Sequence, residues 1–194
     1  MTLSNVVALD TNLFFLINQG MANKFFDILM PVLTKQGLLL FIPYLFYTLW
    51  RGSKTGGFPY FKSALWAILI ALTSAIIAEG IGIVIKDGSA RVRPCHVLEG
   101  IRVLADCPGS YSMPSGHAVR SFALAIPLFH LTRKYISAVW RLYPFILAVF
   151  VAFSRVYVGA HYPSDIVAGA LLGTVVAVIV SALYEQIFSK EISQ

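Results

Sequence analysis

Residues 63–85 read SALWAILIALTSAIIAEGIGIVI, and this stretch decides the fold class. It is apolar almost throughout and carries a single charged residue, Glu79. About 20 consecutive apolar residues form an α-helix long enough to cross the hydrocarbon core of a bilayer. We therefore predict a transmembrane helix from Ser63 to Ile85.

Four further apolar segments predict membrane helices of similar length. They comprise residues 25–50, 116–132, 142–158 and 166–188. Pro31, Lys35 and Gly37 interrupt the first of them, so we expect that helix to be kinked or divided into two parts. The stretch from Leu9 to Gly20 is too short to span a bilayer. We interpret it as an interfacial helix within an N-terminal segment of residues 1–23.

The composition agrees with an integral membrane protein. Of the 194 residues, 58% are hydrophobic and 12% are charged, whereas a soluble domain carries about 25% charged residues. We expect an all-α fold, a polytopic transmembrane helical bundle of five membrane helices in one domain covering residues 1–194. The net charge of +6 resides in loops between apolar segments. This placement favours a lipid bilayer and an anionic ligand as partners and argues against nucleic acid.

The basic residues alone do not decide which loops face the cytoplasm. By the positive-inside rule, loops 51–62 and 133–141 and the tail after residue 188 would be cytoplasmic. That side would hold seven basic residues and the opposite side eight, so the rule decides only if several of the eight are retained for chemistry. The cytoplasmic set would be Arg51, Lys54, Lys62, Arg133, Lys134, Arg141 and Lys190.

Two cysteines, Cys95 and Cys107, lie in the loop from Lys86 to Pro114, which this orientation places outside. Disulfides persist in such oxidising compartments. Closing so short a loop contributes about 3 kcal/mol in the chain-entropy model. We predict a disulfide between them; the alternative is two unrelated thiols.

Three polar segments lie at the ends of the predicted membrane helices: KDGSARVRP (86–94), PSGH (114–117) and SRVYVGAHYPSD (154–165). Because consecutive helices alternate in direction, all three should meet at the same membrane face. Polar groups are costly in a bilayer and are usually functional where they are kept near one. These segments therefore hold the candidate site.

The residue types in these segments suit a phosphate. Lys86, Arg93 and Arg155 would bring three cations to one place, and arginine offers forked donors that match phosphate oxygens. Ser115 stands where a helix N-cap would, and Gly116 allows close approach of the backbone. The free N–H groups of that helix start would then point at the anion. The alternatives are a simple helix cap and basic side chains anchored to lipid headgroups.

His117 and His161 can supply a nucleophile and a general acid. Asp165 follows His161 by four residues, so its carboxylate can hold one imidazole nitrogen protonated and leave the other free to attack. A single histidine near a helix end is more often a cap. All three segments in this order, however, make chance a poor explanation.

Arg120 lies three residues after His117, about one turn deeper on a similar helix face. There it could contact a second phosphate, as in a lipid diphosphate, or a lipid headgroup. The alternative is a structural ion pair with Glu79.

The joint pattern of lysine-x6-Arg-Pro, Pro-Ser-Gly-His and Ser-Arg-x5-His-x3-Asp resembles the type 2 phosphatidic-acid phosphatase superfamily, the lipid phosphate phosphatases. The resemblance covers residues 63–188, the predicted catalytic core. It implies that His161 is the nucleophile that forms a phosphohistidine, that Asp165 orients it, and that His117 protonates the leaving group. It also implies a phosphate cradle that needs no metal or other cofactor, formed by Lys86, Arg93, Ser115, Gly116 and Arg155. Many bacterial members have six membrane helices, so six is the alternative to five.

By this resemblance the chain is expected to be a membrane lipid phosphatase, with undecaprenyl diphosphate as the first choice of substrate. Phosphatidylglycerol phosphate, phosphatidic acid and lipid A 1-phosphate are the alternatives. The rival functions are a lipid phosphotransferase and a non-catalytic lipid-binding membrane protein. The expected location is a bacterial cytoplasmic membrane, with the active site facing the periplasm or cell exterior. The sequence leaves the oligomeric state open.

Overall fold

The computed structural model describes the backbone of residues 3–192 and the side chains of residues 4–187. The described residues form helices and loops and contain no β-strand, which confirms the predicted all-α class. The side chain of Lys190, expected on the cytoplasmic side, lies outside the described residues. In chain order the elements are α1 (Leu3–Phe15), η1 (Leu16–Gly20), α2 (Lys24–Gln36), η2 (Gly37–Leu40), α3 (Phe41–Gly56), α4 (Phe58–Ser89), α5 (Pro94–Val97), α6 (Gly116–Leu131), α7 (Ala138–Tyr157) and α8 (Pro163–Ile192).

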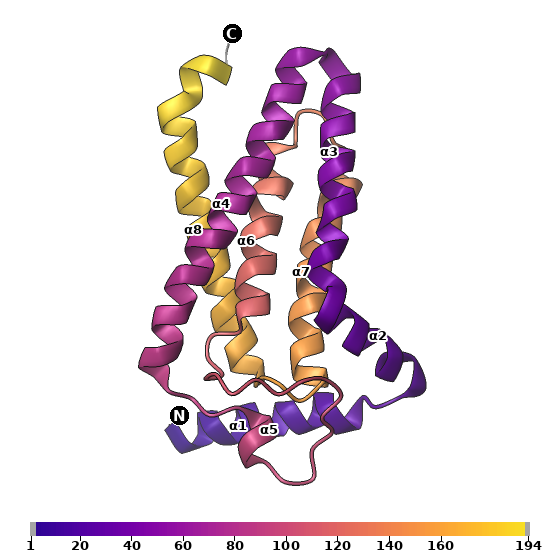
Figure 1. Cartoon of the computed structure of the whole chain (residues 1–194), viewed down its shortest axis with the longest axis vertical. Helices are drawn as coiled ribbons and strands as arrows, with labels where there is room; N and C mark the ends of the chain where they lie inside the picture. The colour runs from indigo at the N-terminus through magenta and orange to yellow at the C-terminus, as the bar shows by residue number, and fades with distance from the viewer. Residues whose placement is uncertain (1–2, 193–194) are drawn as a thin grey trace.

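The long helices stand side by side, and α1 and α5 lie across one end of the bundle (Figure 1). We call this the α1 end. The predicted interfacial helix corresponds to α1, which continues into the π-helical turn η1. The predicted interruption of the first membrane segment is also present, because the 3₁₀ turn η2 separates α2 from α3. At that turn Gly37 packs against the side chain of Val151 on α7.

Four stretches of the described chain are helical, long and apolar enough to cross a membrane. They are Lys24–Gly56, Phe58–Val97, Ala138–Tyr157 and Pro163–Ile187. Large apolar side chains such as Phe46, Ile76 and Val84 point outward from the bundle, where lipid would surround them. The chain is therefore a multi-pass membrane protein.

The fifth predicted membrane helix, α6, has only 16 residues. At 1.5 Å per residue it is about 24 Å long, somewhat shorter than the ~30 Å hydrocarbon core. It packs against α4, α7 and α8, and much of its surface is buried, including Ala118, Val119 and Ala123. Because its neighbours enclose it, α6 is an inner helix, and the count of five crossings stays a prediction.

Glycines on α8 allow its backbone to lie directly against α6. A Cβ atom at Gly169 would lie 2.6 Å from the carbonyl oxygen of Ser115 and 2.9 Å from Cβ of Ala118. One turn further along, a Cβ atom at Gly173 would overlap the carbonyl oxygen of Val119. The backbone N–H of Ser115 also donates to the carbonyl oxygen of Asp165, at 3.0 Å. This contact fixes the start of α6 against the first turns of α8.

Replacing Gly169 by alanine should destabilise the protein although alanine favours helices. The added methyl group would overlap backbone and Cβ atoms of α6, and overpacking of this kind costs about 1–3 kcal/mol. Thermal unfolding of the detergent-solubilised protein would report the change as a lower Tm.

The matched control is Gly80→Ala, because a Cβ atom at Gly80 would meet no other atom within 4 Å. That substitution should be neutral or stabilise α4 by up to about 1 kcal/mol. Equal Tm changes for the two variants would contradict the close contact of α6 and α8.

Candidate active site

The three polar segments predicted from the sequence meet at the α1 end of the bundle. Lys86 lies in the last turn of α4, and the chain then runs across this end to the start of α6. Arg155 lies in the last turn of α7, and Asp165 lies in the first turn of α8. The backbone N–H of Ser112 donates to the carbonyl oxygen of Arg91 at 2.7 Å, which joins the two ends of the long loop.

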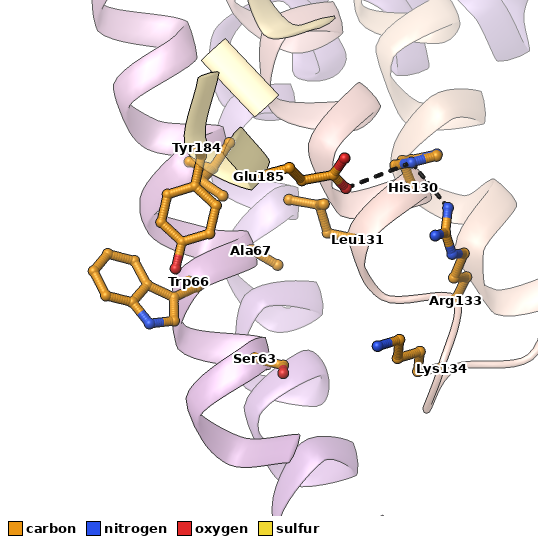
Figure 2. Close-up of a pocket in the computed structure, with 10 residues that line it drawn as sticks. Ser63, Trp66, Ala67, His130, Leu131, Arg133, Lys134, Tyr184 and Glu185 are labelled. Atoms are coloured by element: carbon orange, nitrogen blue, oxygen red, sulfur yellow. Dashed lines mark hydrogen bonds and ion pairs between the residues drawn. The ribbon is translucent and has the colours of Figure 1, made fainter. Parts of the chain in front are cut away.

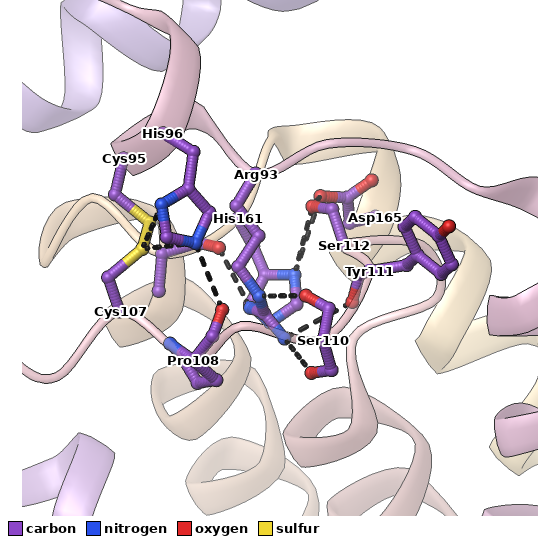
Figure 3. Close-up of a disulfide and its surroundings, with 11 residues drawn as sticks. Arg93, Cys95, His96, Cys107, Pro108, Ser110, Tyr111, Ser112, His161 and Asp165 are labelled. Carbon is purple, nitrogen blue, oxygen red and sulfur yellow. Dashed lines mark hydrogen bonds and ion pairs between the residues drawn. A yellow bond between two sulfur atoms is a disulfide. The ribbon is translucent and has the colours of Figure 1, made fainter.

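His161 and Asp165 form the buried centre of the site; their exposed fractions are 2% and 0%. The imidazole Nδ1 lies 3.4 Å from Oδ2 of Asp165, and Nη1 of Arg93 lies 2.8 Å from Nε2 (Figure 3). Arginine can only donate hydrogen bonds, so Nε2 must be the acceptor. The ring proton therefore resides on Nδ1, facing Asp165, and Nε2 keeps its lone pair.

The environment of His161, in the loop between α7 and α8, keeps the ring neutral. Burial lowers its pKa from the usual value near 6.5 to about 4. The hydrogen bond with Asp165 opposes this shift, while the nearby positive charges of Arg93 and Arg155 add to it. At pH 7 the ring is therefore uncharged, as a nitrogen nucleophile requires.

Asp165 is held by donors that no sequence motif indicated. Its Oδ2 accepts a hydrogen bond from the hydroxyl of Ser112 and another from the backbone N–H of Tyr162, at 2.8 Å. Its Oδ1 lies 2.7 Å from Nη1 of Arg91. Arg91 lies two residues before Arg93 in the first polar segment, and this position is the sequence signal that could have identified it. No sequence pattern identifies Ser112.

The cations predicted for the phosphate cradle lie around this centre. The side chain of Arg93 makes three hydrogen bonds to the long loop, from Nε to the Ser110 carbonyl oxygen at 2.8 Å, from Nη2 to the Ser110 hydroxyl at 3.0 Å and from Nη2 to the Tyr111 carbonyl oxygen at 3.2 Å. Besides its contact with His161, its Nη1 also donates to the Ala160 carbonyl oxygen at 3.0 Å. Arg155 is only 5% exposed, and its Nε has no hydrogen-bond partner among the described residues. The buried hydroxyl of Ser115 likewise has none within the described part of the chain. Buried donors without acceptors are costly, so an anion bound here would satisfy groups that the protein leaves open.

His117, Lys86 and Arg120 border the same cluster. His117 lies near His161, Arg155 and Arg120, close enough to interact with their charges. Lys86 is half-buried and close enough to Arg93 and Glu79 to interact with their charges.

Arg120 forms an ion pair with Glu79, with Nη1 at 2.9 Å from Oε1. This is the structural ion pair that was the alternative to substrate contact. The carboxylate of Glu79 also lies beside Gly116, where a Cβ atom would be 3.2 Å from Oε1. The pair therefore borders the start of α6, next to the predicted cradle.

The structure joins Cys95 and Cys107 by a disulfide, with their Cα atoms 6.3 Å apart. The bridge closes the loop just before Ser110 and Tyr111, which accept hydrogen bonds from Arg93 (Figure 3). Cys95, His96 and Cys107 are close enough together to suggest a metal group, but both sulfurs are engaged in the disulfide. The disulfide thus links the two parts of the loop between α4 and α6 covalently.

A separate pocket of about 100 Å³ lies at the opposite end of the bundle (Figure 2). Its walls come from α4, the end of α6 with the turn that follows, and α8. None of the predicted catalytic or cradle residues lines it. The lining residues are Ser63, Trp66, Ala67, Ile70, His130, Leu131, Arg133, Lys134, Tyr184 and Glu185.

The fold and the site define a multi-pass membrane protein with a buried histidine–aspartate pair inside a cluster of cations. Comparison with protein families makes the identification specific. The family model described as the PAP2 superfamily matches residues 64–189, and the chain belongs to this superfamily. The match confirms the resemblance found in the sequence.

The chain is also similar to named proteins. It is 41% identical over 101 residues to an undecaprenyl-diphosphatase of Sulfolobus acidocaldarius, a match that covers 52% of this chain and 47% of that protein. It is 30% identical to a lipid A 4'-phosphatase of Bacteroides thetaiotaomicron over 85% of this chain and 72% of that one. A transmembrane PAP2-type phosphatidylglycerolphosphate phosphatase from Bacillus subtilis has the same fold, with a TM-score of 0.68, 23% identity and coverage of 94% and 88%. The first match thus spans about half the length of that relative.

The protonation of His161 can be followed directly by nitrogen NMR of protein labelled with ¹⁵N-histidine, with His161→Ala used for assignment. The ring should remain the neutral Nδ1–H tautomer from pH 8 to pH 5 and gain a proton only near its pKa of about 4. An exposed histidine would titrate near 6.5.

The same shift has a consequence for stability. Between pH 6.5 and pH 4 the unfolded chain binds a proton at His161 that the folded chain does not, so the free energy of unfolding should fall as the pH falls through this window. A titration of His161 near 6.5, or an Nε2–H tautomer, would contradict the geometry described above.

Proposed function

We propose that this protein is a membrane lipid phosphatase that hydrolyses a lipid phosphate or diphosphate through a phosphohistidine. The observation that carries the proposal is the His161 lone pair on Nε2, held in a buried cluster of cations with Nδ1–H facing Asp165. Membership of the PAP2 superfamily supports it.

In the first step Nη1 of Arg93 turns from Nε2 of His161 to a phosphate oxygen, which frees the Nε2 lone pair. Nε2 then attacks phosphorus, forming the N–P bond while the bond from phosphorus to the leaving oxygen breaks. The leaving oxygen keeps the electron pair and takes a proton from His117, whose protonated form is favoured once a dianionic phosphate lies beside it. Asp165 stabilises the ring, which becomes cationic because Nδ1 keeps its proton. Lys86, Arg93 and Arg155 stabilise the charge on the transferring phosphoryl group.

In the second step water attacks phosphorus, the N–P bond breaks, and His117 accepts the proton that water loses. Inorganic phosphate leaves and His161 returns to its starting form. No step requires a metal ion.

Undecaprenyl diphosphate is our first choice of substrate, supported by the name of the relative from Sulfolobus acidocaldarius. A lipid A phosphate is the second choice, since a lipid A 4'-phosphatase matches 85% of this chain. Phosphatidylglycerol phosphate and phosphatidic acid are the further alternatives. The lipid tail would lie in the bilayer while the phosphate enters the site at the α1 end.

We place the protein in a bacterial cytoplasmic membrane with the α1 end facing the periplasm or cell exterior. The Cys95–Cys107 disulfide, which lies at that end, supports this orientation, because disulfides persist outside the cytoplasm.

A panel of purified lipid phosphates, assayed with a chelator present, tests the activity. Wild-type protein should release inorganic phosphate from at least one lipid, and His161→Ala should lower the rate by at least about 10³-fold, as loss of a covalent nucleophile does. Labelled phosphate should be trapped on wild-type protein and not on the variant.

Other outcomes separate the rival functions. Equal release by wild type and variant would end the proposed mechanism. Phosphate transferred to a second lipid would indicate a phosphotransferase, and binding without turnover would indicate a lipid-binding protein.

Arg120 provides a test of the diphosphate preference. If its guanidinium leaves Glu79 to bind a second phosphate, Arg120→Ala should raise KM for a diphosphate lipid about 10- to 100-fold, the equivalent of one charge-assisted hydrogen bond. The KM for the corresponding monophosphate should change much less. Arg133→Ala, at the opposite end of the bundle, is the control. Equal small effects on both lipids would leave Arg120 as a purely structural partner of Glu79.

A further inference from the structure

The N-terminal helix α1 is mostly exposed, yet its single acidic side chain is buried. Asp10 is only 7% exposed, and Phe14, one turn further along, is 0% exposed. Phe14 packs against Tyr162, with ring centroids 5.8 Å apart. This face of α1 therefore lies on the segment that carries His161 and Asp165.

Asp10 reaches the catalytic carboxylate through one arginine. Oδ2 of Asp10 lies 2.6 Å from Nη2 of Arg91, and Nη1 of the same guanidinium lies 2.7 Å from Oδ1 of Asp165. The guanidinium also stacks over the ring of Tyr162, 4.0 Å from its centroid. Arg91 thus bridges two buried carboxylates, one from α1 and one from α8.

Asp10 also binds the start of α8. Its Oδ1 accepts a hydrogen bond from the backbone N–H of Ser164 at 2.9 Å, and its Oδ2 accepts one from the Ser164 hydroxyl at 2.5 Å. The first N–H groups of a helix have no partner within the helix. Here a carboxylate from a distant helix supplies one, in the turn from which Asp165 projects.

The charges of Asp10, Arg91 and Asp165 explain why Arg91 binds two carboxylates and not Asp165 alone. Arg91 paired with Asp165 alone would cancel the negative charge that should stabilise a cationic His161 ring. With Asp10 sharing the guanidinium, the three side chains together keep one negative charge. Asp165 then remains an effective acceptor for Nδ1–H of His161.

We propose that Asp10 and Arg91 are positioning residues, through which the N-terminal helix holds Asp165, and with it His161, in the geometry for phosphoryl transfer. The proposal rests on the proposed phosphatase function for its kinetic consequences only. The contacts themselves predict a change at His161 in the resting protein.

The chain offers a matched control for this role. Asp27 forms an ion pair with Arg102 at 2.5 Å and accepts a hydrogen bond from the hydroxyl of Tyr157 at 2.6 Å. This second carboxylate also joins the N-terminal part of the chain to the long loop, but it contacts none of His117, His161 or Asp165. A general loosening of the N-terminal part should follow from either substitution, whereas an effect on His161 should follow only from Asp10→Asn.

The first experiment needs no substrate. In ¹⁵N-histidine-labelled full-length protein, Asp10→Asn should move the Nδ1–H proton resonance of His161 upfield, because Asp165 becomes a weaker acceptor when Arg91 has no other carboxylate. Asp27→Asn should leave the resonance in place. Equal resonances in wild type and Asp10→Asn would overturn the proposal whether or not the protein is a phosphatase.

The second experiment measures turnover of undecaprenyl diphosphate or, if the panel selects it, a lipid A phosphate. Asp10→Asn should lower kcat about tenfold and change KM less than twofold, while Asp27→Asn keeps kcat within twofold. In an Asp165→Asn background, Asp10→Asn should cause no further loss. An equal loss in both backgrounds would show that Asp10 acts elsewhere and would overturn the proposal. A wild type inactive on the whole panel would refute the proposed function and leave the NMR result to decide on Asp10.

If Asp10→Asn does not fold, Arg91→Lys replaces it in both experiments. Lysine keeps the positive charge but cannot bridge two carboxylates as the forked guanidinium does. It should reproduce the kcat loss and the upfield shift. Wild-type values for both would overturn the proposal.

Discussion

A carboxylate with no exposure to solvent must be surrounded by donors, and at Asp165 those donors bring the site together. Arg91 and Ser112 come from the two ends of the long loop, and the N–H of Tyr162 comes from the turn beside His161. The backbone carbonyl oxygen of Asp165 also accepts a hydrogen bond from the backbone N–H of Ser115 at the start of α6. Because a buried charge without partners costs several kcal/mol, each of these segments is constrained to meet at this point.

Close helix packing makes that convergence possible. Lipid tails are as apolar as the helix faces, so there is little hydrophobic force between helices within a bilayer, and small residues allow contact instead. Gly169 and Gly173 bring α8 against the backbone of α6. The same contact places Ser115 of the PSGH segment next to Asp165 of the third segment.

Much of this was accessible from the sequence. The long apolar segments and the order of three polar segments predicted an all-α bundle and a site at one end of it. Asp10 and Arg91 were not predicted, because their role depends on contacts between residues 10, 91 and 165, which no local pattern reports. The enclosure of α6 by its neighbours was likewise not predicted, because hydropathy measures how apolar a segment is and cannot tell whether lipid or protein surrounds it.

The contact between Asp10 and Ser164 also bears on biogenesis. The ribosome makes residue 10 long before residue 164. Asp10 therefore has no Ser164 to bind until almost every other helix has been synthesised. His161 and Asp165 arrive together with that partner. A nascent chain that ends before residue 161 therefore lacks His161, Ser164 and Asp165, and the contact that fixes α1 to the start of α8 can form only after the last helix has begun to emerge.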